Sequence, residues 1–117
     1  RNLYDQAVAW MEKNQEALVR MVRGFAASYE FMNDSKNRAE VMSIVKESLK
    51  VSDEIARQLF APYTEPDKNV LPKRGELDLK AFDRVLKLMG EVGAIPTPIP
   101  PPDRFVDLRY LKAAGIQ

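Results

Sequence analysis

The 117-residue sequence contains no cysteine and no histidine. Without cysteine, the chain can form no disulfide bond and offers no thiol nucleophile. Without histidine, it lacks the side chain that most often transfers protons near neutral pH, and serine–histidine and cysteine–histidine catalysis are excluded. Zinc sites lose their usual ligands, and only carboxylates remain, which suit hard cations. We therefore expect no metal site, no cofactor and no enzymatic activity.

The sequence also has no apolar run long enough to cross a membrane. It has no large excess of positive or negative charge. Eighteen Lys and Arg residues stand against 17 Asp and Glu, so the formal net charge is +1. Long-range attraction to nucleic acid or to an anionic membrane is therefore weak. An apolar content of 45% and a charged content of 30% are ordinary for a soluble globular protein, and the length fits one domain.

Apolar residues recur at helical spacing, and no alternation of apolar and polar residues predicts a strand. Helices are predicted over residues 3–13 and from an Asn14 N-cap to about Met32. The second helix carries the most regular apolar stripe in the sequence. Its members are Leu18, Met21, Val22, Phe25, Tyr29 and Met32.

Polar and proline signals predict two further helices in the middle of the chain. Residues 33–35 separate the second helix from a third, which we expect to begin with a capping box formed by Asn37 and Glu40. Ser52 is the expected cap of a short fourth helix. Pro62 should end that helix, because proline has no backbone N–H to donate.

Glycine and proline divide the last third of the chain. A loop is predicted over 63–76, followed by a fifth helix that begins at an Asp78 N-cap and stops at Gly93. A proline-rich connector over 95–102 then leads to a closing helix over 107–114. The predicted fold class is all-α, with five to six short helices and a proline-rich tail in a single helical segment, 1–117.

Two charged pairs could carry chemistry. The adjacent carboxylates of Asp53 and Glu54 could hold a cation or transfer protons, but acidic residues at this place also stabilise a helix N-terminus, which we favour. Arg20 and Arg23 could bind an anionic group. For this pair we favour a solvated helix face.

Basic residues around the predicted loop and the proline run suggest binding surfaces. Lys68, Lys73 and Arg74 could contact phosphate, but the acidic residues among them argue against a nucleic-acid site. Those acidic residues are Glu65, Asp67 and Glu76. The proline run could bind an SH3-like module, although a rigid connector explains it more simply.

Four aromatic residues at helical spacing could line a ligand cleft, but core packing is the more common role. They are Trp10, Phe25, Tyr29 and Phe60. Gly90 and Gly93 form no phosphate-binding loop, because no strand precedes them and no Gly-Lys-Ser/Thr pattern follows. The sequence therefore predicts no catalytic and no metal-binding residue, and it assigns no ligand contact.

Five segments, in this order, resemble the C-terminal part of ABC-transporter solute-binding proteins of the nitrate, sulfonate and taurine type. They are 14–19 with Tyr29 and Asn33-Asp34, then 37–40, 49–54, 75–93 and 105–111. Phe105-Val106-Asp107-Leu108-Arg109-Tyr110-Leu111 resembles the closing motif of that family. Gln15 departs from the pattern, because proline is commoner there. Related pyrimidine-synthesis proteins use histidine and cysteine, which this chain lacks.

The resemblance implies a parent protein of the type 2 periplasmic-binding fold, with two α/β lobes that close on a small anionic solute and deliver it to an ABC permease. This chain, which starts without Met, would be roughly its last third. The strands and most ligand contacts would lie upstream of Arg1, and the location would be periplasmic or extracytoplasmic, with a lipid anchor as an open alternative.

Under this hypothesis the partners are the solute, the permease and the upstream lobe. We expect an apolar surface where that lobe docks, which the isolated chain could cover by forming a homodimer. The alternative is a free-standing helical module that offers a groove to a partner helix.

Overall fold

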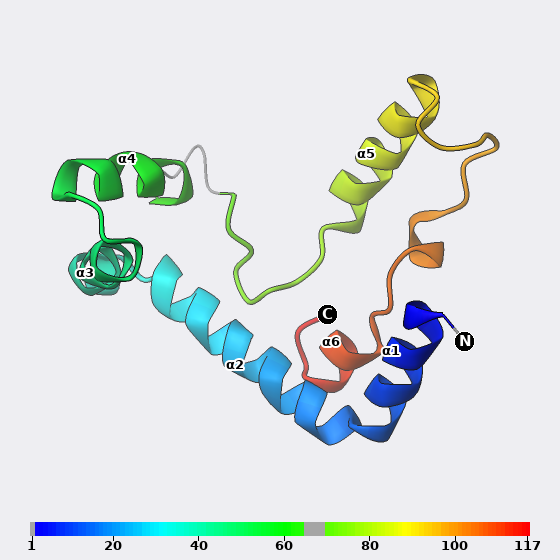
Figure 1. Cartoon of the computed structure of the whole chain (residues 1–117), viewed down its shortest axis with the longest axis horizontal. Helices are drawn as coiled ribbons and strands as arrows, with labels where there is room; N and C mark the ends of the chain where they lie inside the picture. The colour runs from blue at the N-terminus through cyan, green and yellow to red at the C-terminus, as the bar shows by residue number, and fades with distance from the viewer. Residues whose placement is uncertain (1, 65–69) are drawn as a thin grey trace. The chain divides into compact units, whose positions relative to one another are not determined.

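The computed structural model describes residues 2–64 and 70–117, and every regular element in these ranges is helical (Figure 1). The helices are α1 (Leu3–Lys13), α2 (Gln15–Asn33), η1 (Ser35–Asn37), α3 (Arg38–Leu49), α4 (Asp53–Thr64), α5 (Leu79–Glu91), η2 (Pro102–Arg104) and α6 (Arg109–Ala113), where η1 and η2 are 3-10 turns. The all-α prediction is confirmed for this chain.

The chain divides into two compact units. The terminal unit comprises Arg1–Val19 and Glu76–Gln117, and the central unit comprises Arg20–Gly75. Within the central unit, α3 packs against α4 and against η1. Within the terminal unit, α5 packs against η2, and the C-terminal Gln117 side chain exchanges two hydrogen bonds with the backbone of Leu77.

Side chains cap the helices at several of the predicted positions. Ser52 Oγ accepts a hydrogen bond from the Ile55 N–H at 3.3 Å, and Asp78 Oδ1 accepts one from the Ala81 N–H at 2.9 Å. Each bond satisfies a backbone donor that has no partner within its helix. The predicted starts of α4 and α5 at these residues are therefore confirmed.

The predicted stop at Gly93 is also confirmed, and hydrogen bonds explain it. Gly93 has φ +74, a left-handed conformation that glycine adopts without steric cost. The Ala94 N–H reaches back to the Met89 carbonyl at 2.8 Å, and the Gly93 N–H reaches the Gly90 carbonyl at 3.1 Å. These two bonds make a Schellman motif, which satisfies the last carbonyl groups of α5.

Two predicted caps differ from the structure in their side-chain bonds. Asn14 directly precedes α2, and its carbonyl accepts from the Leu18 N–H at 3.0 Å, but its side-chain amide donates to the Trp10 carbonyl at 2.8 Å at the end of α1. Asn37 makes no side-chain cap bond and instead donates to the Phe31 carbonyl at 3.1 Å, so no capping box with Glu40 forms. Asparagine can both donate and accept, and here the donor group finds a carbonyl at the end of the preceding helix.

Two predicted boundaries are also wrong. Pro62 lies inside α4, which continues to Thr64, because a proline near a helix C-terminus interrupts only the final turn. The predicted loop over 63–76 therefore starts too early, and its residues 65–69 lie outside the described residues. The closing helix is shorter than 107–114: α6 covers Arg109–Ala113, and Asp107 Oδ1 accepts from the Arg109 N–H at 3.0 Å just ahead of it.

Few side chains of the described residues are buried, and half of the buried ones are alanines. The central unit buries Ala26, Val41 and Ala56, and the terminal unit buries Leu86, Tyr110 and Ala114. Alanine buries little apolar area, so each core is small. Much of the apolar surface that the amphipathic sequence provides is consequently left uncovered.

Candidate functional site

The acidic pair at the start of α4 has the geometry of a helix terminus. Asp53 Oδ1 forms an ion pair with Lys46 Nζ on α3 at 3.0 Å, and both side chains are exposed. The hydrogen bond and positive charge of Lys46 lower the pKa of Asp53, whereas a general acid at neutral pH needs a raised pKa. Glu54 accepts a 3.5 Å hydrogen bond from Gln58 one turn later. These contacts join and stabilise helices.

The residues around this ion pair line a hollow of about 310 Å³ between α3 and α4. Lys46 and Arg57 contribute positive charge and Asp53 contributes negative charge, so the hollow has no concentrated charge of one sign. Across residues 2–64 and 70–117, no three acidic residues come together in a group that could hold a metal ion.

Among the described basic residues singled out from the sequence, Arg74 is paired with a carboxylate. Arg74 Nε donates to Glu30 Oε1 at 2.7 Å, which neutralises its charge within the central unit. Arg20 and Arg23 are exposed on α2. Lys68 lies outside the described residues.

The aromatic residues behave in two different ways. Tyr29 is half-buried, with its ring against Gly75, and Phe60 lies beside Tyr63 with ring centroids 5.8 Å apart. Trp10 and Phe25, by contrast, are 56% and 57% exposed. The expectation that all four aromatic residues pack in a core is not met by Trp10 and Phe25, because more than half of each side chain stays exposed.

An apolar pocket lies between α2 and α3 in the central unit. Its volume is about 460 Å³, and its lining residues are Ala27, Ser28, Phe31, Met32, Val41, Ile44 and Val45. No titratable side chain lines it, so it can recognise apolar groups but has no means of acid–base chemistry. The sequence analysis did not find this pocket, because Ala27, Phe31 and Ile44 lie off the principal stripe of α2 or on another helix.

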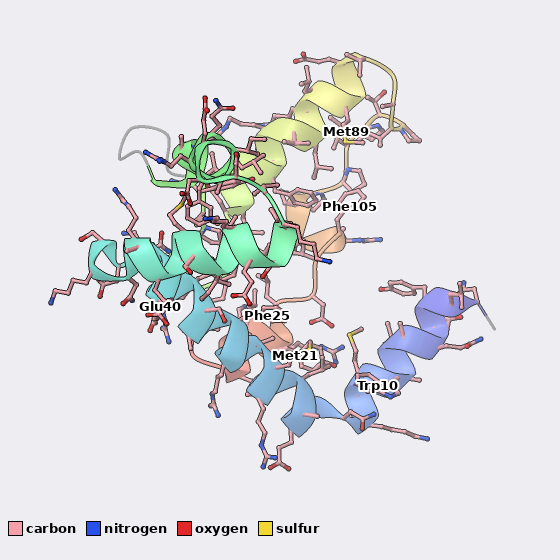
Figure 2. The ribbon with its side chains drawn as sticks, turned by 60° about the vertical axis from the view of Figure 1, so that its left-hand side comes forward. Trp10, Met21, Phe25, Glu40, Met89 and Phe105 are labelled. Atoms are coloured by element: carbon pink, nitrogen blue, oxygen red, sulfur yellow. The ribbon has the colours of Figure 1, made fainter. Side chains whose placement is uncertain are left out.

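The pocket continues into an exposed strip of α2. Met21 and Phe25 lie one helical turn apart and are 52% and 57% exposed (Figure 2). Phe31 and Ile44, which line the pocket, are 38% and 51% exposed. We call the pocket together with Met21 and Phe25 the α2–α3 face. It is the candidate functional site.

The closing motif forms a charged cluster in the terminal unit. Arg109 donates two hydrogen bonds to Asp107, from Nη2 to Oδ2 at 2.7 Å and from Nε to Oδ1 at 3.0 Å. Its Nη1 donates a third, to Glu12 Oε1 on α1 at 3.4 Å. The side-chain hydrogen bond with Asp107 raises the pKa of Arg109 and lowers that of Asp107. The cluster fastens α6 to α1, and its charges are already paired with each other.

The same motif places a second hollow, of about 390 Å³, beside α1. Tyr4, Val8 and Met11 line it from α1, and residues 104–107 line it from the closing segment. Phe105 also meets the Phe82 ring edge-on at 6.3 Å. Arg104 and Asp107 give this hollow one charge of each sign, so it has no preference for an anion.

Tyr110 is the buried residue of the closing motif, and its hydroxyl has no hydrogen-bond partner among the described residues. A buried donor without a partner costs about 1–3 kcal/mol. We expect Tyr110→Phe to leave the unfolding free energy of the 117-residue chain unchanged or to raise it by up to about 1 kcal/mol. The Arg109 guanidinium, 5.5 Å from the ring centroid, would keep its contact with the phenyl ring.

Urea denaturation of the unchanged chain, of the Tyr110→Phe variant and of an exposed Tyr4→Phe control measures this effect. A loss above about 1 kcal/mol for Tyr110→Phe alone would mean that the hydroxyl has a hydrogen-bond partner in solution.

None of the helices described here is long and apolar enough to span a bilayer. Comparison of the chain with protein-family models, with curated proteins and with solved structures finds no match.

Proposed function

We propose that this chain is the C-terminal part of a solute-binding protein, which captures a small anionic solute of the nitrate or sulfonate kind and delivers it to an ABC permease. The observation that carries the proposal is the order of the five family-like segments, which end in Phe105–Leu111. The parent would have two α/β lobes, with its strands upstream of Arg1. This chain would supply helices that finish and support one lobe.

The chemistry of the chain favours a supporting role over a ligand-gripping one. The buried side chains among the described residues are apolar apart from the Tyr110 hydroxyl, whereas an anion held away from water needs several buried donors. Of its hollows, the α2–α3 pocket is apolar and the hollow beside α1 carries one charge of each sign. The groups that bind the solute would therefore come from the upstream segment.

The test begins with the coding sequence upstream of Arg1. We expect a signal peptide followed by alternating strand and helix patterns. The complete translation product, purified and heated with nitrate, taurine or an alkanesulfonate at about 100 times the dissociation constant, should gain about 2.7 kcal/mol of stability for the right solute. A product about three times as long as this chain has an unfolding entropy of about 0.7 kcal/mol/K, so this gain corresponds to a rise in the melting midpoint of about 4 °C.

Two controls accompany this measurement. The 117-residue chain alone should show no shift with the same solute, and a cation of similar size should not shift the complete protein. A start codon directly before Arg1, or a complete product that responds to no anion of the panel, would contradict the proposal.

The second candidate function is that of a free-standing helical interaction module. The α2–α3 face favours it, because an apolar pocket between two helices suits the apolar face of a partner helix. A start codon directly before Arg1 would make it the leading hypothesis.

A further inference from the structure

The apolar stripe of α5 has one buried edge and one exposed edge. The buried edge carries Leu86, which is 3% exposed, on a helix that packs against η2. The exposed edge carries Val85, Leu88 and Val92, which are 51%, 58% and 71% exposed. Single exposed apolar residues are common on protein surfaces, whereas several on one helix form a continuous strip that water solvates poorly.

The exposed apolar residues form a line along α5. At about 100° per residue, Val85, Leu88 and Val92 lie within about 60° of one another. Ala81, one turn before Val85, falls on the same line. The four residues are spaced by four, three and four positions, which is the spacing that allows the side chains of two helices to interdigitate. We call these four residues the α5 edge, and none of them is charged.

One flank of the α5 edge carries two opposite charges. Arg84 and Glu91 lie about 70–90° from the centre of the edge, on the side away from Phe82 and Met89. Both side chains are exposed. The flank is therefore positive near the start of α5 and negative near its end, and such an order of charges is matched by the same helix in the reverse direction.

The apolar residues of the α5 edge are also complementary to the same edge in reverse. In an antiparallel pair of α5 helices, Val85 can lie opposite the partner's Leu88. The same register places Ala81 opposite the partner's Val92, because both pairs of positions are symmetric about one point of the helix. A two-fold axis through that point repeats each contact, as in a dimer that uses the same patch on both copies.

This apolar register also brings the charges of the flank together. A two-fold axis perpendicular to an antiparallel pair places the same flank of both helices on the same side. Arg84 then lies within about 3 Å of the partner's Glu91 along the helix axis, which is a distance that their long side chains can span. Two such ion pairs form in each dimer, and flanking pairs of this kind set the orientation of paired helices. The net charge of +1 adds little repulsion between two copies.

We infer that the α5 edge is a self-association surface, through which two copies of this chain pair their α5 helices antiparallel with an Arg84–Glu91 ion pair on each side of the two-fold axis. The inference goes beyond the proposed function and does not rest on it, because it uses residues of α5 alone. One short helix from each copy makes a small interface, so we expect a dissociation constant on the order of 100 µM.

Sedimentation equilibrium of the 117-residue chain between about 5 and 500 µM tests the inference, and the measured mass should rise toward that of a dimer. Leu88→Ser removes an apolar contact twice in each dimer and should weaken association at least about ten-fold. At about 5 µM the unchanged chain is monomeric, so a substitution at Leu88 acts there on the monomer alone, and circular dichroism checks that Leu88→Ser keeps its helix content.

Charge reversals on the flank test the antiparallel register. Arg84→Glu and Glu91→Arg should each weaken association about ten-fold, because each places like charges opposite one another twice. An equal mixture of the two variants should form a heterodimer, in which both facing pairs are again opposite in charge. The double variant Arg84→Glu/Glu91→Arg should associate like the unchanged chain. Arg23→Glu, which makes the same change of net charge on α2, is the matched control and should change the dissociation constant less than about two-fold.

Each other outcome overturns the inference. A chain that stays monomeric at about 500 µM has no self-association surface, and its α5 edge is left to a different partner. A dimer that Leu88→Ser does not weaken uses another surface. A dimer whose two charge variants do not associate with each other lacks the antiparallel register. The charge variants alter exposed positions only, so they decide the question if Leu88→Ser does not fold.

Discussion

Leu86→Ala is expected to lower the free energy of unfolding of the 117-residue chain by about 2–5 kcal/mol. Leu86 is 3% exposed and is the largest aliphatic side chain among the described buried residues. Its truncation removes apolar contacts and leaves a cavity that the neighbours fill only in part. The effect is large relative to the few kcal/mol that a chain of this size with so small a core retains.

Leu88→Ala is the matched control, because Leu88 lies on the same helix, is 58% exposed and loses the same atoms. We expect a change within about 0.5 kcal/mol for this surface position. Urea denaturation followed by circular dichroism at 222 nm measures both. Leu86→Met, which keeps most of the volume, should cost less than about 1.5 kcal/mol and keeps the comparison possible if the alanine variant is unfolded.

Equal losses for Leu86→Ala and Leu88→Ala would contradict the assignment of α5 residues to a buried and an exposed side.

Local signals predicted the helices well because they act over a few residues. Asp78 and Gly93 set the ends of α5 through hydrogen bonds to neighbours three to five positions away. The same reasoning placed Ser52 at the start of α4 correctly. It placed Asn14 correctly before α2 but did not predict its side-chain bond, because an asparagine side chain next to two helices can serve either one, and here the amide donates to the Trp10 carbonyl of α1.

The candidate site was harder to predict because burial depends on partners distant in sequence. The periodicity of α2 identified Met21, Phe25 and Tyr29 as one stripe, but it could not show that Tyr29 meets Gly75 while Phe25 stays 57% exposed. The pocket itself requires α3 to lie beside α2. The available signal in the sequence was the apolar stripe of α2, which is wider than α2 needs in order to pack within a core.

The contact between α5 and the proline-rich connector predicts that Gly90→Ala changes the unfolding free energy in opposite directions with and without the Ile99 side chain. A Cβ atom at Gly90 would lie 2.5 Å from Ile99 Cδ1 and 2.9 Å from Ile99 Cγ1. Relieving the second overlap requires a rotation about χ1 of Ile99, which is stiff because isoleucine is branched at Cβ. Overpacking of this kind costs about 1–3 kcal/mol.

Gly90→Ala alone should therefore lower the unfolding free energy by about 1 kcal/mol, since helix propensity returns up to about 1 kcal/mol of the steric cost. In an Ile99→Ala background the obstruction is gone, and the same Gly90→Ala change should raise stability by about 0.5–1 kcal/mol. The two backgrounds should thus differ by about 1–3 kcal/mol, which is the coupling energy of the contact. Urea denaturation of the four proteins measures it. A Gly90→Ala variant that gains stability equally in both backgrounds would show that Ile99 leaves α5 at little cost, and that the connector is not fastened to the helix at this point.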